Sequence, residues 1–295
     1  MKQSITTLIA DISKRLHTEY RDPVLMRQTA WWLIEALTNL TQTQLIAQQE
    51  LELSIVQQKQ LDVWITELTS LHKPLQYILG TVPFADLEIV VKPPILIPRP
   101  ETEEWVLNLI KQLQPYKNQK FSILDIGTGS GCVALALAKA LPNASVTAVD
   151  IDPHALDLAC TNAHHNKIHN IAFLESDVYS GLKPHDTYDL IVSNPPYITQ
   201  EEWKELDPSV TQWENPDALL ALDNGLAVIE RIINGAQKHL NPDSELHINH
   251  MPRLIIEIGY AQGPKVQTLM KQIGFHHVDI LKDLEGKDRV VAGRL

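Results

Sequence analysis

The sequence has few cysteines and no long apolar runs, and each shortage excludes a class of protein. The two cysteines, Cys132 and Cys160, are not in CxxC spacing, so neither a disulfide framework nor a zinc site is indicated. No run of about 18 uncharged apolar residues offers a membrane-spanning helix. Residues 1–30 contain acidic side chains and do not resemble a signal or transit peptide. We therefore expect a cytoplasmic protein without a membrane partner.

Basic residues are also in short supply. The chain has 25 lysines and arginines against 36 aspartates and glutamates, a net charge of −11, and it has no local basic stripe. Proteins that neutralise nucleic-acid phosphates carry the opposite excess, so direct nucleic-acid binding is not expected. The 12 histidines include the pairs His164–His165 and His276–His277. No carboxylate accompanies these pairs at ligand spacing, and no metal site is predicted.

The length and the patterning indicate more than one domain. With 295 residues and 44% apolar content, the chain is long enough for two domains with sizeable cores. Residues 1–75 repeat apolar side chains at helical spacing, which predicts a small bundle made of helices only. Residues 76–100 are rich in proline, which predicts a β-hairpin or extended linker and excludes a helix from Tyr77 to Pro100.

Residues 101–295 alternate apolar runs with helix-like stretches, which is typical of a parallel sheet with helices on both faces. The expected strands are 121–126, 145–150, 171–174, 188–193 and 254–258. After a helix near 262–273, the runs 276–281 and 288–294 are separated by too few residues for a crossover helix, so they should pair antiparallel. The predicted fold class is α/β, with a mostly parallel sheet that ends in an antiparallel strand.

A glycine-rich turn follows the first of these strands. The stretch LDIGTGSG places Gly127, Gly129 and Gly131 between the strand and the next helix, where glycine permits a tight turn and a close approach of a ligand to the backbone. A dinucleotide fingerprint would need glycine at position 132, which is Cys132. The observed spacing is the variant associated with S-adenosylmethionine, although a plain strand-to-helix turn is an alternative.

Two acids follow the next two strands. Asp150 ends the strand 145–150, where a carboxylate can accept hydrogen bonds from both ribose hydroxyls of an adenosine-containing ligand. It could instead cap the next helix, but Asp152 before Pro153 suits the capping position better and leaves Asp150 available. Asp177 follows the third strand and is a candidate partner for an adenine amino group.

The strand 188–193 stops abruptly at Asn194, Pro195, Pro196 and Tyr197. Proline cannot continue a sheet ladder and has no N–H, so the nearby carbonyls lie in a rigid backbone without competing donors. Together with the side-chain oxygen of Asn194, such carbonyls can hold both hydrogens of a planar NH₂ group, and Tyr197 offers a flat face above it. The tetrapeptide therefore predicts a site that positions a conjugated, poorly nucleophilic nitrogen.

As a set, these motifs resemble the family of peptide chain release factor glutamine methyltransferases, also called PrmC or HemK. The resemblance runs from about residue 74 to the C-terminus. It rests on the glycine turn, VD at 149–150, SNPPYI at 193–198, PLQYILG at 74–80, LIPRPETE at 96–103, LIIEIGYAQG at 254–263 and DLEGKDRVV at 283–291. The NPPY motif alone is shared with adenine-N6 DNA methyltransferases.

The resemblance implies a class I Rossmann-like domain in residues 101–295 that methylates the glutamine of the Gly-Gly-Gln loop in class I release factors. It assigns residues 1–75 to substrate recognition, and we expect a monomer. Asn194 to Tyr197 would form the substrate amide site. The S-adenosyl-L-methionine site would comprise Gly127, Thr128, Gly129, Ser130, Gly131, Asp150, Asp177, Val178 and Asn194.

Several features depart from the family pattern or lack an assigned role. Val178 occupies a position that is often tryptophan in relatives, and segment 239–253 looks longer than a usual turn. Arg99 and Glu101 could shape the substrate side of the site. The acidic stretch Glu201–Asp217 is expected to be solvated and to face a basic partner surface.

Two other functions fit parts of the sequence. The same chemistry on adenine in DNA is opposed by the acidic balance and by the absence of a basic recognition insert. A non-catalytic adaptor, binding a release factor or the ribosome through residues 1–75, is opposed by the presence of every motif residue at the NPPY site.

Overall fold

The computed structural model describes residues 2–244 and 251–295 and divides the chain into two compact units. The first unit contains Met1–Thr81 and Asp207–Trp213, and the second contains Val82–Leu206 and Glu214–Leu295. Residues 245–250, within the segment 239–253 noted above, lie outside the described residues. Each unit has its own buried apolar core.

Five helices build most of the first unit, and local sequence signals explain where the longer ones begin. They are α1 (Ile5–Arg15), α2 (Pro23–Thr38), α3 (Gln42–Gln48), α4 (Ile55–Leu71) and α5 (Leu75–Leu79). The residues before the first four, Ser4, Asp22, Thr41 and Ser54, each accept a backbone N–H with their side chains, which satisfies a donor that the helix leaves unpaired. The helices bury leucine and isoleucine against one another.

Two expectations for this part of the chain are wrong in detail. Residues 1–75 are not helices only, because β1 (Gln3–Ser4) pairs antiparallel with β2 (Glu50–Leu51). These strands have two residues each, which is too short to give an alternating pattern in the sequence. A helix also covers residues 75–79, because the prolines that exclude helix begin only at Pro83, after the left-handed Gly80 ends α5.

A short segment far along the chain belongs to the first unit. Asp207–Trp213 contains α10 (Pro208–Thr211). The Trp213 indole N–H donates to the Leu71 carbonyl at 2.8 Å, and the Lys73 ammonium lies 5.4 Å from the centroid of the Trp213 ring, within cation–π range. The chain therefore passes between the units at three points, near residues 81, 206 and 213.

The second unit is built on a sheet of seven described strands in the order β10-β11-β9-β8-β5-β6-β7. β11 is antiparallel to both neighbours, whereas the pairs from β9 to β7 are parallel. The strands are β5 (Ser122–Ile126), β6 (Ser145–Asp150), β7 (Ile171–Glu175), β8 (Leu190–Ser193), β9 (Leu254–Glu257), β10 (His276–Lys282) and β11 (Asp288–Arg294). The predicted fold class and the antiparallel C-terminal pair are confirmed.

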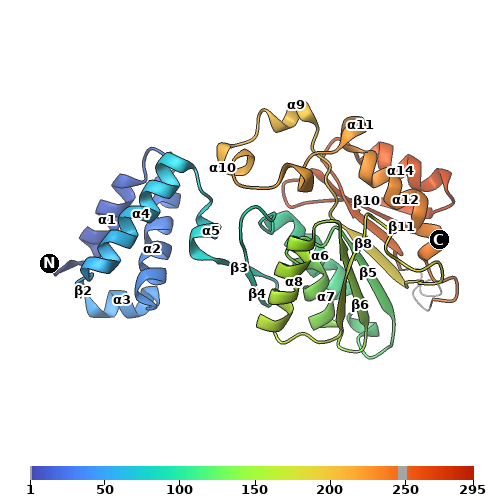
Figure 1. Ribbon diagram of the computed structural model, residues 1–295, viewed down its shortest axis with the longest axis horizontal. Helices are drawn as coiled ribbons and strands as arrows, with labels where there is room; N and C mark the ends of the chain where they lie inside the picture. Colours follow the sequence, from blue (N-terminus) through green and yellow to red (C-terminus); the bar gives the residue numbers. More distant parts are fainter. Residues whose placement is uncertain (1, 245–250) are drawn as a thin grey trace. The chain divides into compact units, whose positions relative to one another are not determined.

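Helices cover both faces of this sheet (Figure 1). On one face lie α6 (Pro100–Leu113), α7 (Cys132–Ala140) and α8 (Pro153–His165), and on the other lie α12 (Ala227–His239) and α14 (Gly263–Gln272). Because both faces are covered, the central strands read as continuous apolar runs. The short helices η1 (Gln114–Tyr116), α9 (Gln200–Trp203), η2 (Pro216–Ala218) and α11 (Leu222–Gly225) lie in the connections.

A hairpin of β3 (Thr81–Phe84) and β4 (Leu87–Val90) is attached to α8 through one buried side chain. Asn162 is fully buried. It accepts from the Val90 N–H at 2.7 Å and donates to the Val90 carbonyl at 3.0 Å and the Ser130 carbonyl at 2.9 Å. One asparagine therefore ties the hairpin and the glycine turn to the same helix.

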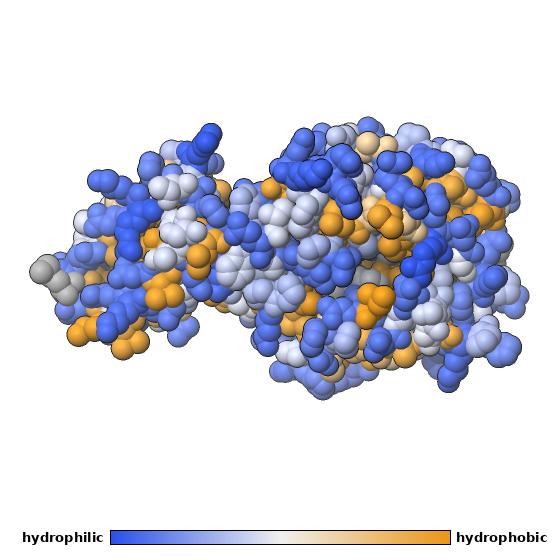
Figure 2. Space-filling model, turned by 45° about the horizontal axis from the view of Figure 1, so that its top comes forward, coloured by the Kyte–Doolittle hydropathy of each residue, from blue (hydrophilic) through white to orange (hydrophobic). Residues whose placement is uncertain are grey.

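Apolar side chains reach the surface in separate small groups among hydrophilic ones on the face seen in Figure 2. The most exposed include Val24, Ile55, Val56 and Leu284. Among residues 2–244 and 251–295, no helix combines the length and the apolar character that crossing a bilayer requires.

Replacing Asn162 with alanine should destabilise the second unit. The change removes the partner of the half-buried Val90 N–H and carbonyl and of the buried Ser130 carbonyl, and we expect a loss of about 2–4 kcal/mol in the free energy of unfolding. Equilibrium urea unfolding followed by tryptophan fluorescence measures this loss. Thr161→Ala, one residue earlier on the exposed side of α8, is the matched control and should stay within about 0.5 kcal/mol of the wild type. Equal behaviour of the two variants would contradict the anchoring role of Asn162.

Candidate active site

A cavity of about 360 Å³ opens at the carboxyl ends of β5, β6 and β8. Ligands bind at this edge in open α/β sheets because connections diverge there and leave a crevice. The sequence-predicted residues that line the cavity are Gly127, Gly129, Asp150, Asp177, Val178, Asn194 and Pro196. The structure thus brings most of the predicted site together.

The glycine turn presents backbone to this cavity. Gly127, Gly129 and Gly131 have φ values of 71°, 56° and 84°, in the left-handed region that favours glycine. A Cβ on Gly131 would lie 2.9 Å from the Ala159 Cβ, so this glycine permits contact between α7 and α8 and does not line the cavity. The Thr128 hydroxyl turns inward and donates to the buried Asp125 carboxylate at 2.7 Å.

Asp150 holds the glycine turn as well as facing the cavity. Its Oδ2 accepts from the Gly129 N–H at 2.8 Å, and its Oδ1 accepts from the Asp152 N–H at 3.0 Å. Asp152 caps α8 as predicted, by accepting from the His154 N–H. Asp150 is therefore less free than expected, although an ionised carboxylate has further lone pairs for hydroxyl donors. Burial raises the pKa of Asp150, partly offset by these N–H groups.

Asp177 and Val178, which follow β7, also line the cavity. The Asp177 Oδ2 lies 2.7 Å from an Arg231 Nη2, and both side chains are about half exposed. Val178 is buried and has φ of 57°, a conformation that a β-branched residue rarely adopts. The Ser176 hydroxyl donates to the Val178 carbonyl at 2.9 Å and helps to hold this turn. Val178 therefore contributes an apolar surface where relatives were expected to place an aromatic ring.

The NPPY tetrapeptide begins beside the glycine turn but divides its side chains between two directions. Asn194 and Pro196 line the cavity, whereas Pro195 is buried and Tyr197 packs against the core. The Tyr197 hydroxyl donates to Glu257 Oε1 at 3.3 Å. The pKa of Tyr197 is raised mainly by burial and, to a smaller extent, by the negative charge of Glu257. The ring of Tyr197 therefore supports the loop from behind, instead of lying among the cavity-lining side chains.

A second, smaller cavity of about 40 Å³ shares Gly127, Gly129 and Asn194 with the larger one. Arg99 and Thr102 also line it. The Arg99 Nη2 donates to both oxygens of Glu214, at 2.7 and 2.6 Å. Glu214 is only 3% exposed, so the expectation that the whole acidic stretch Glu201–Asp217 is solvated is wrong at this position.

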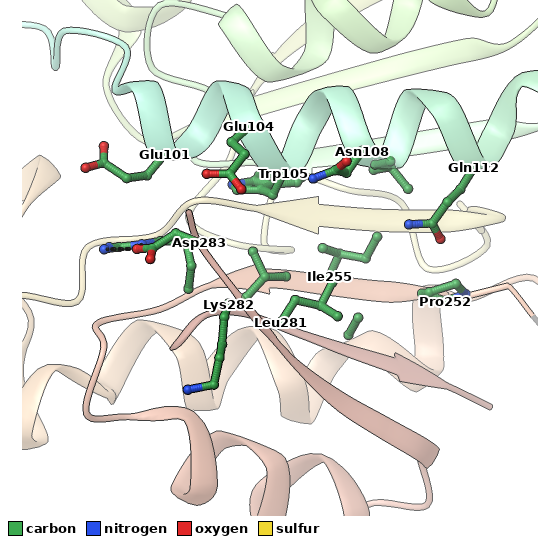
Figure 3. A pocket seen from close by; sticks show the side chains of 14 residues that line it. Glu101, Glu104, Trp105, Asn108, Gln112, Pro252, Ile255, Leu281, Lys282 and Asp283 are labelled. Atoms are coloured by element: carbon green, nitrogen blue, oxygen red, sulfur yellow. Dashed lines mark hydrogen bonds and ion pairs between the residues drawn. The ribbon is translucent and has the colours of Figure 1, made fainter. Parts of the chain in front are cut away.

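Glu101 lies in a different place from Arg99. Figure 3 shows Glu101, Glu104 and Asn108 along α6, facing a groove between this helix and the strands below it. This groove is about 60 Å³ and does not include Arg99 or Asn194. Of Arg99 and Glu101, only Arg99 lines the smaller cavity next to Asn194.

Several cavity residues were missed by sequence reasoning. They include Ile95, Leu96, Ile151, Asn215, Asp217, Ala218, Val228 and Arg231. Ile151 had a usable signal, because it is a large apolar residue directly after the acid at the end of β6, and it is 62% exposed. Asn215–Ala218 had none, since their position depends on a contact with the distant Pro94 carbonyl.

The fold and site define a class of protein. A seven-stranded sheet with one antiparallel strand near its end, a glycine turn after β5 and an acid after β6 are the features of a Rossmann-like methyltransferase. Residues 106–212 match the Methyltransferase small domain family. The hMettl16 catalytic domain in complex with an RNA hairpin of the MAT2A 3′UTR has the same fold, with a TM-score of 0.52, 16% identity and 82% of each chain covered.

Comparison with named relatives is more specific. Residues 7–80 match the PrmC N-terminal domain. The release factor glutamine methyltransferase of Lactococcus lactis is 37% identical over 98% of each chain. That of Salmonella typhimurium is 37% identical over 94% of this chain and 95% of its own length. The chain belongs to the release factor glutamine methyltransferase family, which confirms the resemblance seen in its motifs.

The buried Asp125 should make stability depend on pH. Burial and the neighbouring Asp150 charge raise the pKa of Asp125 to about 7. A carboxyl with a raised pKa stabilises the folded state fully below about pH 4, and this contribution is lost as the pH rises through 7.

Asp125→Asn should remove this dependence. Between pH 5 and pH 8, we expect the free energy of unfolding of Asp125→Asn to rise by about 2 kcal/mol relative to the wild type. Urea unfolding at several pH values measures the difference. Asp157→Asn, which changes an exposed acid on α8, should follow the wild-type pH profile. Parallel profiles for all three proteins would contradict the raised pKa of Asp125.

Proposed function

We propose that this protein transfers a methyl group from S-adenosyl-L-methionine to the side-chain amide nitrogen of the Gly-Gly-Gln glutamine in class I peptide chain release factors. One observation carries the proposal. Asn194 lies in the wall shared by the two cavities and directly beside the glycine turn, so a single side chain can face both a cofactor and an acceptor amide. The names of the relatives supply the substrate class.

The larger cavity fits S-adenosyl-L-methionine in size and in chemistry. A cavity of about 360 Å³ is in the usual range for a small-molecule site. Gly127 and Gly129 would let the ligand approach the backbone, Asp150 would accept from the ribose hydroxyls, and Ile151 offers an exposed apolar surface for the base. When bound, this cofactor supplies a methyl group carried by a positively charged sulfur.

The substrate amide would occupy the smaller cavity. The Asn194 Oδ1 and the Pro195 carbonyl would accept the two hydrogens of the glutamine NH₂ group, which fixes the plane of the amide and directs its nitrogen towards the larger cavity. An amide nitrogen is a weak nucleophile, so orientation and stabilisation of the developing positive charge by these two oxygens are the main contributions of the protein. The nitrogen gains a methyl group and loses one proton, which leaves to water.

The acidic stretch is a proposed contact for a basic partner surface. Glu201, Glu202, Glu205, Asp207 and Asp217 are exposed, whereas Glu214 is paired with Arg99. Exposed acids on a protein of net charge −11 favour approach of a positively charged partner, mainly through the association rate.

Two alternatives are weaker. Adenine methylation in DNA shares the NPPY chemistry, but the net charge of −11 opposes duplex binding, and the match of residues 7–80 to the PrmC N-terminal domain favours a protein substrate. A non-catalytic adaptor would not need the cavity. Calorimetry with S-adenosyl-L-methionine separates this alternative, because an adaptor should give no binding heat.

Methylation of a release factor tests the proposal directly. Mass spectrometry of a purified class I release factor, after incubation with the protein and cofactor, should find a single methyl group on the Gly-Gly-Gln glutamine. Asn194→Ala should reduce kcat by about a hundredfold or more, because it removes an acceptor that orients the amide. Its affinity for the cofactor should stay within about threefold of the wild type by calorimetry. Near-normal turnover by this variant would refute the role of Asn194.

Salt should slow the encounter with the release factor. We expect the association rate to fall about threefold to tenfold between about 50 and 300 mM salt, because added salt shortens the Debye length and screens the attraction between exposed charges. Stopped-flow fluorescence measures this rate. In the double variant Glu201→Gln, Glu205→Gln, the rate should be lower and less sensitive to salt. An association rate independent of salt in the wild type would remove the acidic stretch from the interface.

A further inference from the structure

A buried glutamate behind the candidate active site gathers three hydrogen-bond donors. Glu257, at the end of β9, is 1% exposed. Its Oε2 accepts from the Thr102 hydroxyl at 2.7 Å and from the Trp105 indole N–H at 2.8 Å. Its Oε1 accepts from the Tyr197 hydroxyl at 3.3 Å. This carboxylate therefore joins the first turns of α6 to the NPPY loop.

The same network reaches Asn194 through Thr102. The Thr102 hydroxyl has one hydrogen, and a carboxylate oxygen can only accept it. Thr102 must then use a lone pair towards Asn194, whose side-chain nitrogen lies 3.2 Å from the Thr102 Oγ1. Only the NH₂ end of the Asn194 amide can donate to that lone pair. The donors and acceptors therefore run in one direction, from Asn194 to Thr102 to Glu257.

We infer that Thr102 and Glu257 are positioning residues that fix which way round the Asn194 amide faces. With its NH₂ group held by Thr102, Asn194 must turn its Oδ1 towards the cavity, where it can accept from a substrate NH₂. A rotation of the amide by half a turn would place two acceptors, the Asn194 Oδ1 and the Thr102 hydroxyl oxygen, against each other. This inference rests on the proposed function and deepens it, because it explains how the acceptor is kept in the correct orientation.

Trp105 helps to fix the direction of the hydrogen bonds that run from Asn194 through Thr102 to Glu257. The indole N–H is a donor only, so Glu257 Oε2 stays an acceptor. Burial raises the pKa of Glu257, but any added proton would sit on Oε1, where it faces Tyr197. Figure 3 shows Trp105 extending from α6 towards the strands below, and its side chain is buried. Protonation of Glu257 would therefore leave the Thr102 contact in place.

The backbone of the NPPY loop is held independently of this network. The Tyr197 carbonyl accepts from the Gln262 Nε2 at 3.0 Å, and a Cβ on Gly225 would overlap the same carbonyl. Gly225 has φ of 78°, a second reason for glycine at this position. A change at Thr102 should therefore affect the Asn194 side chain without releasing the loop.

Three variants separate positioning from a general structural role. Thr102→Val keeps the shape but removes the hydroxyl, and we expect kcat for release factor methylation to fall about tenfold or more, with the cofactor Kd within about twofold. Thr102→Ser restores the hydroxyl and should recover activity to within about threefold of the wild type. Glu257→Gln keeps an acceptor oxygen for Thr102 and Trp105 and should lose less activity than Thr102→Val. Thr268→Val, exposed on α14, is the control and should match the wild type.

A second readout does not depend on activity. In protein labelled with ¹⁵N-asparagine, the Asn194 side-chain NH₂ signal is assigned by its loss in Asn194→Ala. Its protons should exchange slowly with water in the wild type and in Thr102→Ser, and at least about tenfold faster in Thr102→Val, because the Thr102 acceptor is gone.

The outcomes keep the inference distinct from the proposed function. If the wild-type protein methylates no release factor, the proposed function fails, and the exchange measurement still tests the orientation of Asn194. Unchanged exchange and unchanged kcat in Thr102→Val would overturn the inference. A parallel loss of cofactor binding, or an equal loss in Thr102→Ser, would also overturn it, because either result indicates a structural defect at α6.

Discussion

The candidate site depends on the register of three neighbouring parallel strands, β5, β6 and β8. This register places the ends of the three strands side by side. Ile126 of β5 pairs with Val149 of β6 and with Ser193 of β8. Gly127, Asp150 and Asn194 are therefore the first residues beyond these pairs on three neighbouring strands. The Ser193 hydroxyl donates to the Ile126 carbonyl at 2.7 Å, which adds a side-chain bond to the ladder at the point where the loops diverge. A slip of one residue would turn these side chains to the opposite face.

Three buried acids surround this edge of the sheet, and each is held by different partners. Asp125 accepts from Thr128, Glu214 pairs with Arg99, and Glu257 accepts from Thr102, Trp105 and Tyr197. Burial of a carboxylate is tolerated only where donors or an opposite charge compensate it. Each acid consequently fixes the direction of the hydroxyl or guanidinium group beside it. The acids thus organise the polar groups of the site, and of the three only Asp125 lines the smaller cavity.

Much of this arrangement could be predicted from the sequence, because strand ends and turn residues are local signals. The apolar runs identified the parallel strands, and the glycines, Asp150 and Asn194 follow them directly. The inward direction of Tyr197 could not be predicted, because it depends on Glu257, 60 positions further along the chain. The Arg99–Glu214 pair spans 115 positions, and the docking of Trp213 on Leu71 spans 142. Such contacts depend on tertiary packing, which periodicity and spacing do not encode.

Glu257 is better suited to orient Asn194 than to accept the proton released by the reaction. A route through Thr102 would require the Asn194 side-chain amide to give up a proton, which amides do not do at neutral pH. A route through Tyr197 would require ionisation of a phenol whose pKa is raised by burial and by Glu257 itself. Both routes are closed by the same contacts that fix the direction of the hydrogen bonds. A buried carboxylate with two donors on one oxygen therefore acts as a fixed acceptor and not as the base of the reaction.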